Sequence, residues 1–188
     1  MKMIILDRDG VINHDSDAYI KSPDEWVPIP GSLEAIARLN RAGYRVVVAT
    51  NQAGIARGLF DIDTLMDIHA RLHRELAEMG GGIDGVFFCP HGPEDDCRCR
   101  KPRPGLLEEI ARRLGVSLSG VPAVGDSVRD LEAAATVGAQ SVLVRTGKGA
   151  AALASGAVPP STPVFTDLAA FVDAHLKSAA AESAGADD

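Results

Sequence analysis

Residues 3–10 read MIILDRDG: four apolar residues lead into two aspartates that flank an arginine, and a glycine follows. Residues 2–6 have the length and composition of a buried β-strand, and the polar residues with the glycine mark its end. In an open parallel sheet, ligands bind beyond the carboxyl ends of the strands. The two aspartates therefore occupy a position from which such a sheet presents functional groups.

The rest of the chain alternates short apolar runs with segments of helical periodicity. Further strands are predicted at residues 44–49, 85–89, 121–125, 140–144 and 163–165. Helices are predicted at residues 32–42, 61–79, 104–114 and 128–137, with a last helix capped by Thr166 or Asp167. Ser32 is the expected cap of the first helix. This alternation predicts an α/β fold, a doubly wound parallel sheet with helices on both faces.

Length and composition indicate one globular domain. The chain has 188 residues, of which 46% are hydrophobic and 24% are charged, and this composition is ordinary for a globular protein. We expect a single domain over residues 1–177 with a minimal cap. Residues 178–188 are rich in alanine and low in complexity, so we expect this tail to be disordered.

Charge and cysteine content argue against several classes of function. The net charge is −7 and aromatic residues make up 4% of the chain, whereas nucleic-acid-binding proteins need basic surface and stacking residues. No apolar run approaches the ~20 residues that span a membrane, and Asp7 interrupts the first run too early for a signal peptide. Three clustered cysteines are a poor disulfide framework. We expect a monomeric cytoplasmic protein that binds neither nucleic acid nor membrane.

Acidic residues follow two of the predicted strands. Asp7 and Asp9 come after the first strand, and Asp126 follows the strand at 121–125. The carboxyl ends of parallel strands share one edge of the sheet, so these aspartates are expected to converge there. Two unit charges ~4 Å apart repel by about 4 kcal/mol at an effective dielectric of about 20. The cluster therefore calls for a cation or shifted pKa values, and all-oxygen ligands suit Mg²⁺.

Four segments, in order, resemble the signature motifs of the haloacid-dehalogenase phosphohydrolases: ILDRDG at 5–10, VVATNQ at 47–52, CRKP at 99–102 and VGDSVRD at 124–130. Together they extend over nearly all of the expected folded chain. The resemblance implies a Rossmann-like sheet with the first strand in the centre. It also implies a phosphatase that transfers the phosphoryl group of its substrate to an aspartate.

The resemblance assigns a role to each motif residue. Asp7 resembles the nucleophile that forms an aspartyl-phosphate, and Asp9 resembles the general acid that later serves as base. Thr50 and Lys101 would stabilise the charge on the transferring phosphoryl group. Asp126 would complete a catalytic Mg²⁺ site together with Asp7 and the main-chain carbonyl of Asp9.

Cys89, His91, Cys97 and Cys99 place four soft metal ligands within a short loop. Structural Zn²⁺ sites take four ligands tetrahedrally, and three cysteines with one histidine are a common set. Four protein ligands leave no open position for water, so we expect a structural zinc, although the sequence does not exclude iron. The loop ends just before Lys101, so the metal would fix the segment that carries this lysine.

The metal-binding loop narrows the resemblance to a subgroup. CPHG at 89–92 and CRCRKPRPG at 97–105 resemble the zinc-containing phosphatases, which include heptose 1,7-bisphosphate 7-phosphatases and histidinol-phosphatases. TNQAGIARG at 50–58 and LVRTGKG at 143–149 resemble the heptose enzymes. The resemblance implies that the substrate is a sugar phosphate, D-glycero-D-manno-heptose 1,7-bisphosphate, which would lose its 7-phosphate.

Polar residues near the predicted phosphate site are candidates for substrate binding: Asn13, Asp15, Asn51, Gln52, Arg57 and Arg100. The two arginines carry charges that suit the remote phosphate of a bisphosphate, and the loop residues suit sugar hydroxyls.

Three alternatives remain open on sequence alone. A histidinol-phosphatase would need acidic groups for the substrate amine, which Asp15, Asp17 and Glu25 could supply. A phosphatase of small phosphoesters in general would use the same machinery with an open rim. A phosphoryl-receiving signalling domain also uses an aspartate, Mg²⁺ and a lysine. However, an acid/base such as Asp9 beside the nucleophile would make its phosphorylated state short-lived.

Overall fold

The chain folds around a parallel β-sheet, with strands joined by helices. The computed structural model describes residues 2–184, and within them the sheet has six strands in the order β3-β2-β1-β4-β5-β6. The strands are β1 (Met3–Leu6), β2 (Arg45–Asn51), β3 (Gly85–Cys89), β4 (Pro122–Gly125), β5 (Gln140–Val144) and β6 (Val164–Phe165). Ile4 aligns with Val46 of β2, and Ile5 aligns with Ala123 of β4. The first strand is therefore central, as the resemblance implied.

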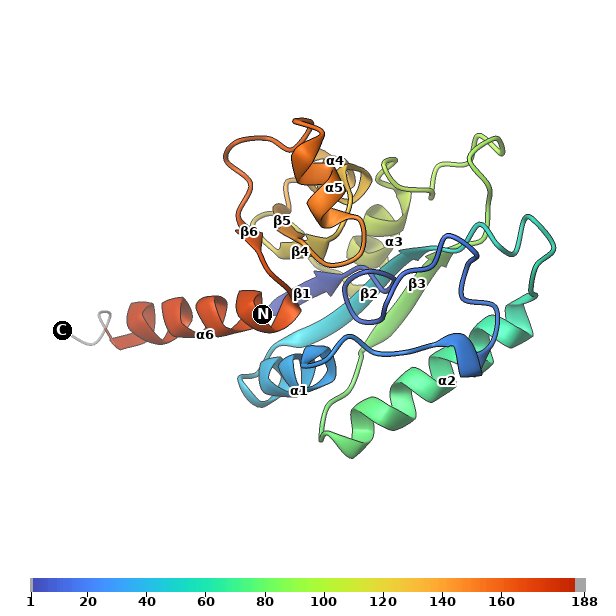
Figure 1. The fold of residues 1–188 in the computed structure, drawn as a ribbon. Coiled ribbons are helices and arrows are strands. Elements are labelled where there is room, and N and C mark those ends of the chain that lie inside the picture. Colours follow the sequence, from blue (N-terminus) through green and yellow to red (C-terminus); the bar gives the residue numbers. More distant parts are fainter. Residues whose placement is uncertain (1, 185–188) are drawn as a thin grey trace.

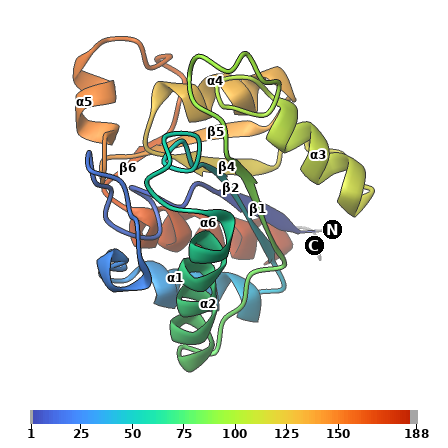
Figure 2. The same cartoon turned by 90° about the vertical axis from the view of Figure 1, so that its right-hand side faces the viewer.

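Helices cover both faces of this sheet (Figures 1 and 2). They are α1 (Ser32–Arg41), α2 (Ile62–Glu78), α3 (Gly105–Leu114), α4 (Val128–Thr136), α5 (Gly149–Ala154) and α6 (Leu168–Ala184), with a 3₁₀ turn at Pro23–Glu25. Successive side chains of a strand point to opposite faces. Ile4 and Leu6 accordingly pack in the core beneath α1, α2 and α6, whereas Met3 and Ile5 pack beneath α3 and α4.

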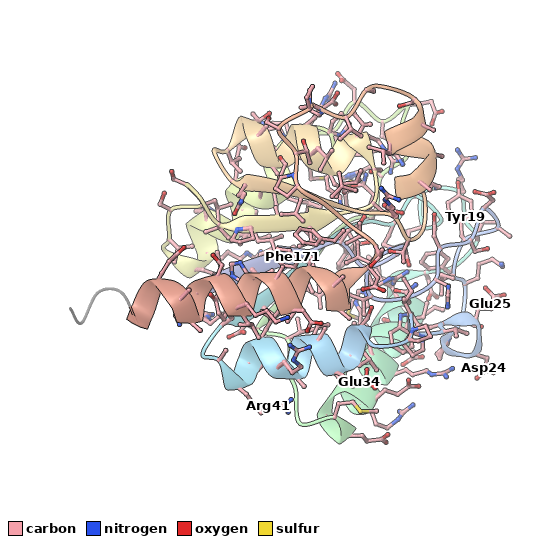
Figure 3. The ribbon with its side chains drawn as sticks, turned by 60° about the vertical axis from the view of Figure 1, so that its left-hand side comes forward. Tyr19, Asp24, Glu25, Glu34, Arg41 and Phe171 are labelled. Atoms are coloured by element: carbon pink, nitrogen blue, oxygen red, sulfur yellow. The ribbon has the colours of Figure 1, made fainter. Side chains whose placement is uncertain are left out.

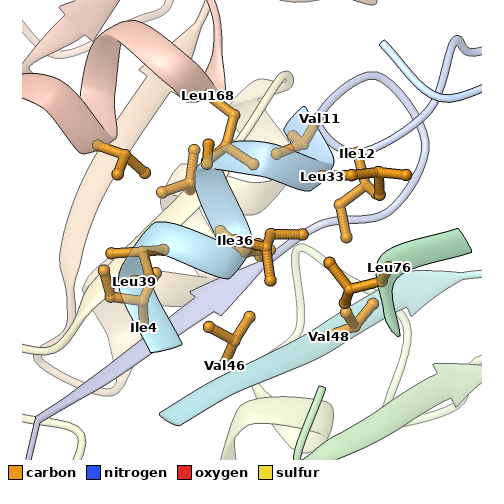
Figure 4. Close-up of a cluster of buried hydrophobic side chains, with 14 of the residues drawn as sticks. Ile4, Val11, Ile12, Leu33, Ile36, Leu39, Val46, Val48, Leu76 and Leu168 are labelled. Carbon is orange, nitrogen blue, oxygen red and sulfur yellow. The ribbon is translucent and has the colours of Figure 1, made fainter. Parts of the chain in front are cut away.

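The larger core lies between the sheet and helices α1, α2 and α6 (Figure 4). Ile36 and Leu39 of α1 and Val46 of β2 are fully buried there. Phe171 of α6 adds an aromatic edge contact with Phe165, at 5.5 Å between ring centroids, where α6 lies alongside α1 (Figure 3). Both faces are thus sealed by apolar side chains, and the functional groups remain at the ends of the strands.

Three local features differ from the sequence-based expectations. Ser32 is the first residue of α1 and not its cap. The cap is Gly31, with φ of 84°, and the Ser32 hydroxyl instead donates to the Val11 carbonyl at 2.9 Å. Helix α5 and the 3₁₀ turn were not expected. Helix α6, which Asp167 caps through the Ala170 N–H, continues to Ala184, so residues 178–184 are helical and not a disordered tail. Residues 185–188 lie outside the described part.

The order of the strands creates a switch point beside β1. The chain builds β2 and β3 on one side of β1, and then β4, β5 and β6 on the other. Crevices at the carboxyl ends of strands next to such a point are the usual ligand sites of α/β sheets. Asp7 leaves β1 at this point, between the ends of β2 and β4. No described helix is both long and apolar enough to span a membrane.

Candidate active site

Asp7 is the first residue beyond β1, at the centre of the crevice. Its main-chain N–H donates to the Val124 carbonyl of β4 at 2.9 Å, which continues the sheet pairing by one residue. Its carboxylate Oδ1 accepts the Arg8 N–H at 2.7 Å and lies 3.1 Å from Lys101 Nζ. Main-chain hydrogen bonds therefore fix the predicted nucleophile, and its carboxylate faces the predicted phosphoryl-binding lysine.

Lys101 reaches this point from the loop after β3. Its side chain is buried, and Nζ lies 2.6 Å from Asp130 Oδ1 and donates to the Ala49 carbonyl at 2.7 Å. Asn51 fixes the lysine's main chain by two hydrogen bonds of 3.1 Å, one to its carbonyl and one from its N–H. Contacts from two separate segments, β2 and α4, thereby hold Lys101 with its ammonium facing Asp7.

Asp126 follows β4 and approaches Asp7 from the other side. Its Oδ2 accepts the Lys148 N–H at 2.8 Å. Glycines are required around this carboxylate because a Cβ on Gly10 would lie 2.0 Å from Asp126 Oδ2, and one on Gly147 would lie 2.1 Å from it. Both glycines also have positive φ, 82° and 57° respectively, so the backbone conformation and the lack of space each require glycine.

Asp130 balances the lysine and caps a helix. Its Oδ2 accepts hydrogen bonds from the N–H and the hydroxyl of Ser127, at 3.0 and 2.6 Å, in a capping box that begins α4. Its Oδ1 pairs with Lys101. Burial raises its pKa, but the Lys101 charge and the hydrogen bonds from Lys101 and Ser127 together outweigh this and hold the pKa of Asp130 below its usual value. Asp130 is therefore the anion that keeps Lys101 charged and in place.

Asp7, Asp126 and Asp130 together carry more negative charge than Lys101 can balance. Burial, followed by the charge of Asp130, raises the pKa of Asp126 to about 7. Burial also raises the pKa of Asp7 against the opposing charge of Lys101, and the neighbouring aspartates add to the rise. Carboxylate oxygens of Asp7, Asp126 and Asp130 lie within 4.8 Å of one another. A hard divalent cation on Asp7 and Asp126 fits both the donor set and the charge deficit.

Asp9 pairs with Arg8 and not with Lys101, and several hydrogen-bond donors surround its carboxylate. Asn13 Nδ2 and Gln52 Nε2 donate to it at 2.8 and 2.9 Å, and Arg8 donates through Nε and Nη2. Burial raises its pKa, but the Arg8 charge and these hydrogen bonds more than offset that, so the pKa of Asp9 is lowered. One part of the carboxylate remains open to the crevice.

Asn13 does not take the position expected of a substrate-binding residue. It is fully buried and does not line the crevice, and its amide N–H groups go to Asp9 and to the His14 carbonyl. The main chain of Asn13 lies in a tight turn after β1, in which its N–H and two others donate to the Arg8 carbonyl. Asn13 therefore supports Asp9 and cannot meet a sugar hydroxyl.

Thr50 and Gln52 lie at the end of β2 and are buried. Gln52 Nε2 donates to the Thr50 hydroxyl at 2.9 Å as well as to Asp9. Both residues line the crevice, as do Asn51, Asp15, Arg57 and Arg100. The structure thus brings these six predicted site residues to one place.

The crevice is a cavity of about 330 Å³, and its lining includes the four motif aspartates and Lys101. Arg100 stands over it and donates to the His91 carbonyl at 3.2 Å. Arg57 stacks over the Tyr19 ring at 5.7 Å, and Asp15 pairs with Lys148 Nζ at 3.1 Å. Cationic and anionic groups therefore surround the opening, suited to a polar, multiply charged ligand.

Two cations at the opening were missed by sequence reasoning: Arg129 and Lys148. Arg129 lies within the VGDSVRD motif, which assigned it no role, and is exposed at the start of α4. Lys148 precedes α5, a helix whose six residues are too few for a clear periodic signal. Both residues follow a predicted strand, β4 and β5 respectively, and this position in the sequence could have identified them as candidates for the site.

The four predicted metal ligands of the long loop do converge. Cys89 Sγ lies 3.6 Å from His91 Nδ1, 3.7 Å from Cys97 Sγ and 3.2 Å from Cys99 Sγ, and His91 Nδ1 lies 3.3 Å from Cys99 Sγ. A zinc tetrahedron with Zn–S of about 2.3 Å has S···S edges of about 3.8 Å. The set, called here the Cys/His cluster, therefore has the donors and nearly the dimensions of a tetrahedral site.

Comparisons with known proteins agree with this geometry. The polynucleotide kinase 3 phosphatase family model matches residues 2–130, and the HAD-hydrolase-like model matches residues 98–171. A D-glycero-beta-D-manno-heptose-1,7-bisphosphate 7-phosphatase of Bordetella bronchiseptica is 60% identical over 95% of this chain and 100% of its own. The Pseudomonas aeruginosa enzyme of that name is 57% identical over 93% and 98%.

A solved structure is equally similar. The crystal structure of D,D-heptose 1,7-bisphosphate phosphatase from B. bronchiseptica, complexed with magnesium and phosphate, superposes with a TM-score of 0.93 at 60% identity. It matches 95% of this chain and 99% of the other. The α/β fold and the resemblance read from the sequence are confirmed. The chain belongs to the haloacid-dehalogenase-like (HAD) phosphatases.

Proposed function

We propose that this phosphatase removes the 7-phosphate of D-glycero-β-D-manno-heptose 1,7-bisphosphate. The observation that carries the proposal is the pairing of Asp7 with buried Lys101 at the floor of a cavity whose opening holds further cations. A bisphosphate brings one phosphoryl group to react and a second to be recognised. Relatives of this name at 57% to 60% identity over nearly their whole length support the sugar.

The first half of the reaction transfers the phosphoryl group to Asp7. A carboxylate oxygen of Asp7 forms a bond to phosphorus while the bond from phosphorus to the sugar's O7 breaks. Lys101 and the Thr50 hydroxyl stabilise the charge on the phosphoryl oxygens. Asp9 delivers a proton to O7, so the sugar leaves as an alcohol.

The second half regenerates the enzyme. Asp9, now a carboxylate, takes a proton from a water molecule whose oxygen bonds to phosphorus. The bond between phosphorus and Asp7 breaks, and inorganic phosphate leaves. The donors that lower the pKa of Asp9 favour the form that this step requires. For the first half, Asp9 must take up a proton before the sugar departs.

Two metal ions complete the proposal. Asp7, Asp126 and the main-chain carbonyl of Asp9 would hold Mg²⁺, which when bound supplies the positive charge that lets an anionic substrate approach Asp7. The Cys/His cluster would hold Zn²⁺ as a structural ion. Arg100 and Lys101 directly follow Cys99, so this ion would fix the segment that carries both.

Arg100 is proposed as the main contact of the phosphate that is not hydrolysed, with Arg57 as a second candidate. One Nη of Arg100 already binds the His91 carbonyl, which fixes the guanidinium at the cavity opening. We expect Asp15 and its partner Lys148, which also line the cavity, to contact sugar hydroxyls. The monomeric state and cytoplasmic location stay predictions.

The main alternative, a histidinol-phosphatase, is less well supported. It needs a free carboxylate for the substrate amine. Of the three candidates, Asp15 is paired with Lys148 and Glu25 with Lys21, which leaves Asp17 at the cavity as the remaining one. A polynucleotide 3′-phosphatase, which one matching family model suggests, is disfavoured by the net charge of −7.

A panel of phosphate esters tests the proposal. The bisphosphate of each heptose anomer, histidinol phosphate and p-nitrophenyl phosphate are compared by kcat/KM, and ³¹P NMR identifies the phosphate that is lost. The proposal expects the highest kcat/KM for the β-bisphosphate, with loss of the 7-phosphate alone. A higher kcat/KM for histidinol phosphate, or loss of the 1-phosphate, would refute it.

A further inference from the structure

Arg8 is a buried cation that the proposed reaction steps do not use. It lies between Asp7 and Asp9 in the sequence, yet its side chain is entirely buried and does not line the cavity. Burying a guanidinium is unfavourable unless its charge and its N–H groups are matched by partners. The partners of Arg8 therefore indicate why the fold retains it.

The Arg8 guanidinium joins Asp9 to a histidine of α2. Nε and Nη2 lie 3.0 and 2.8 Å from Asp9 Oδ1, and Nη2 also lies 3.0 Å from Oδ2. Nη1 lies 3.3 Å from His69 Nε2. Arginine only donates hydrogen bonds, so His69 Nε2 is the acceptor and the imidazole is neutral. His69 is itself buried, beside the Phe88 ring of β3.

The contact with His69 fixes the orientation of the Arg8 guanidinium on the side that does not contact Asp9. His69 holds one edge of the planar group, so that the opposite edge meets the carboxylate of Asp9 in a fixed orientation. Asn13 and Gln52 complete the set of donors to Asp9. A general acid acts only when one oxygen is held within hydrogen-bond reach of the leaving group.

We propose that Arg8, anchored by His69, is the positioning residue of the acid/base Asp9. It holds the carboxylate so that one part faces the cavity, and it prevents the side chain from turning toward Lys101. The inference rests on the proposed role of Asp9 but not on the identity of the sugar. The side chains of Arg8 and His69 act through Asp9 and do not line the cavity; the one contact of Arg8 with a proposed metal-binding carboxylate is from its main-chain N–H to Asp7.

Paired substitutions at His69 separate positioning from packing. His69→Gln keeps a side-chain acceptor for Arg8, whereas His69→Phe fills a similar volume without one. The control is His73→Phe, which makes the same change on the exposed residue one turn along α2. Arg8→Lys is the second test, because a lysine keeps the charge but cannot bridge Asp9 and His69 as the planar fork does. Circular dichroism and melting temperature establish that each variant is folded.

The assay compares phosphate esters whose leaving groups differ in their need for a proton. Release of p-nitrophenolate in a single turnover needs no acid, whereas release of a sugar or glycerol alkoxide does. We expect His69→Phe and Arg8→Lys to lower the single-turnover rate on alkyl phosphates by about 10- to 100-fold, a part of what general acid–base catalysis contributes. The p-nitrophenolate rate should stay within about twofold. His69→Gln should recover most of the alkyl-phosphate rate, and His73→Phe should match the parent.

Equal losses on both classes of ester in folded variants would overturn the inference, as would equal losses in His69→Gln and His69→Phe. Unchanged alkyl-phosphate rates in His69→Phe, or in Arg8→Lys if the phenylalanine variant does not fold, would also overturn it. If the parent enzyme hydrolyses simple alkyl phosphates but not the heptose bisphosphate, only the proposed substrate fails. The monoester series then still tests the role of Arg8.

Discussion

Replacement of Arg100 by alanine should separate recognition of the substrate from the chemistry. Arg100 lines the cavity and is fixed by its hydrogen bond to the His91 carbonyl, so its other donors can meet a second phosphate. A charge-assisted contact of this kind is worth roughly 1.5–3 kcal/mol, which corresponds to about 10- to 150-fold in kcat/KM. We expect that loss for heptose 1,7-bisphosphate and a much smaller one for p-nitrophenyl phosphate.

The matched control is Arg103→Ala in the same loop. Arg103 also donates to a carbonyl of the metal-binding loop, that of Cys97, at 2.6 Å, and it pairs with Asp96, but it does not line the main cavity. Its loss removes a loop contact without removing a charge from the cavity. If Arg100→Ala depressed both substrates equally, or if Arg103→Ala reproduced its selectivity, Arg100 would not be the phosphate clamp.

Three further outcomes are expected. Asp9→Asn should lower kcat on the heptose bisphosphate by about 10²–10⁴-fold, and full activity on this poor leaving group would exclude the acid role. Treatment with EDTA should stop hydrolysis and added Mg²⁺ should restore it, because Lys101 alone does not balance Asp7 and Asp126; activity in fully demetallated protein would contradict this. Cys97→Ser should lower both the zinc content, measured by elemental analysis, and the melting temperature. Metal-free protein with an unchanged melting temperature and kcat would refute a structural zinc.

The convergence of the motif residues could be predicted because the alternation of strands and helices indicates a parallel sheet. Asp7 and Asp126 each follow an apolar run, and the ends of parallel strands share one edge, so their meeting required no knowledge of the loops. The Cys/His cluster could be predicted for a different reason: its four ligands lie close together in the sequence and form a common zinc-binding set.

Side-chain direction within loops could not be predicted in the same way. Asn13 was expected to face a sugar, but the turn after β1 buries it, and it serves Asp9 instead. Arg8 and His69 lie in separate segments with no shared motif, so their contact depends on how α2 packs against the sheet. Lys148 gains its role from the position of the short helix α5, which the composition of residues 149–154 does not reveal.

The most direct measurement of the central claim is chemical trapping of the phosphorylated enzyme. The protein is mixed with heptose 1,7-bisphosphate and quenched during turnover, and borohydride then reduces any acyl phosphate to an alcohol. Peptide mass spectrometry locates the reduced residue. The account predicts reduction at Asp7, dependent on substrate and absent in Asp7→Asn, which should also be inactive. Sustained turnover in Asp7→Asn, or reduction at a different carboxylate, would contradict it.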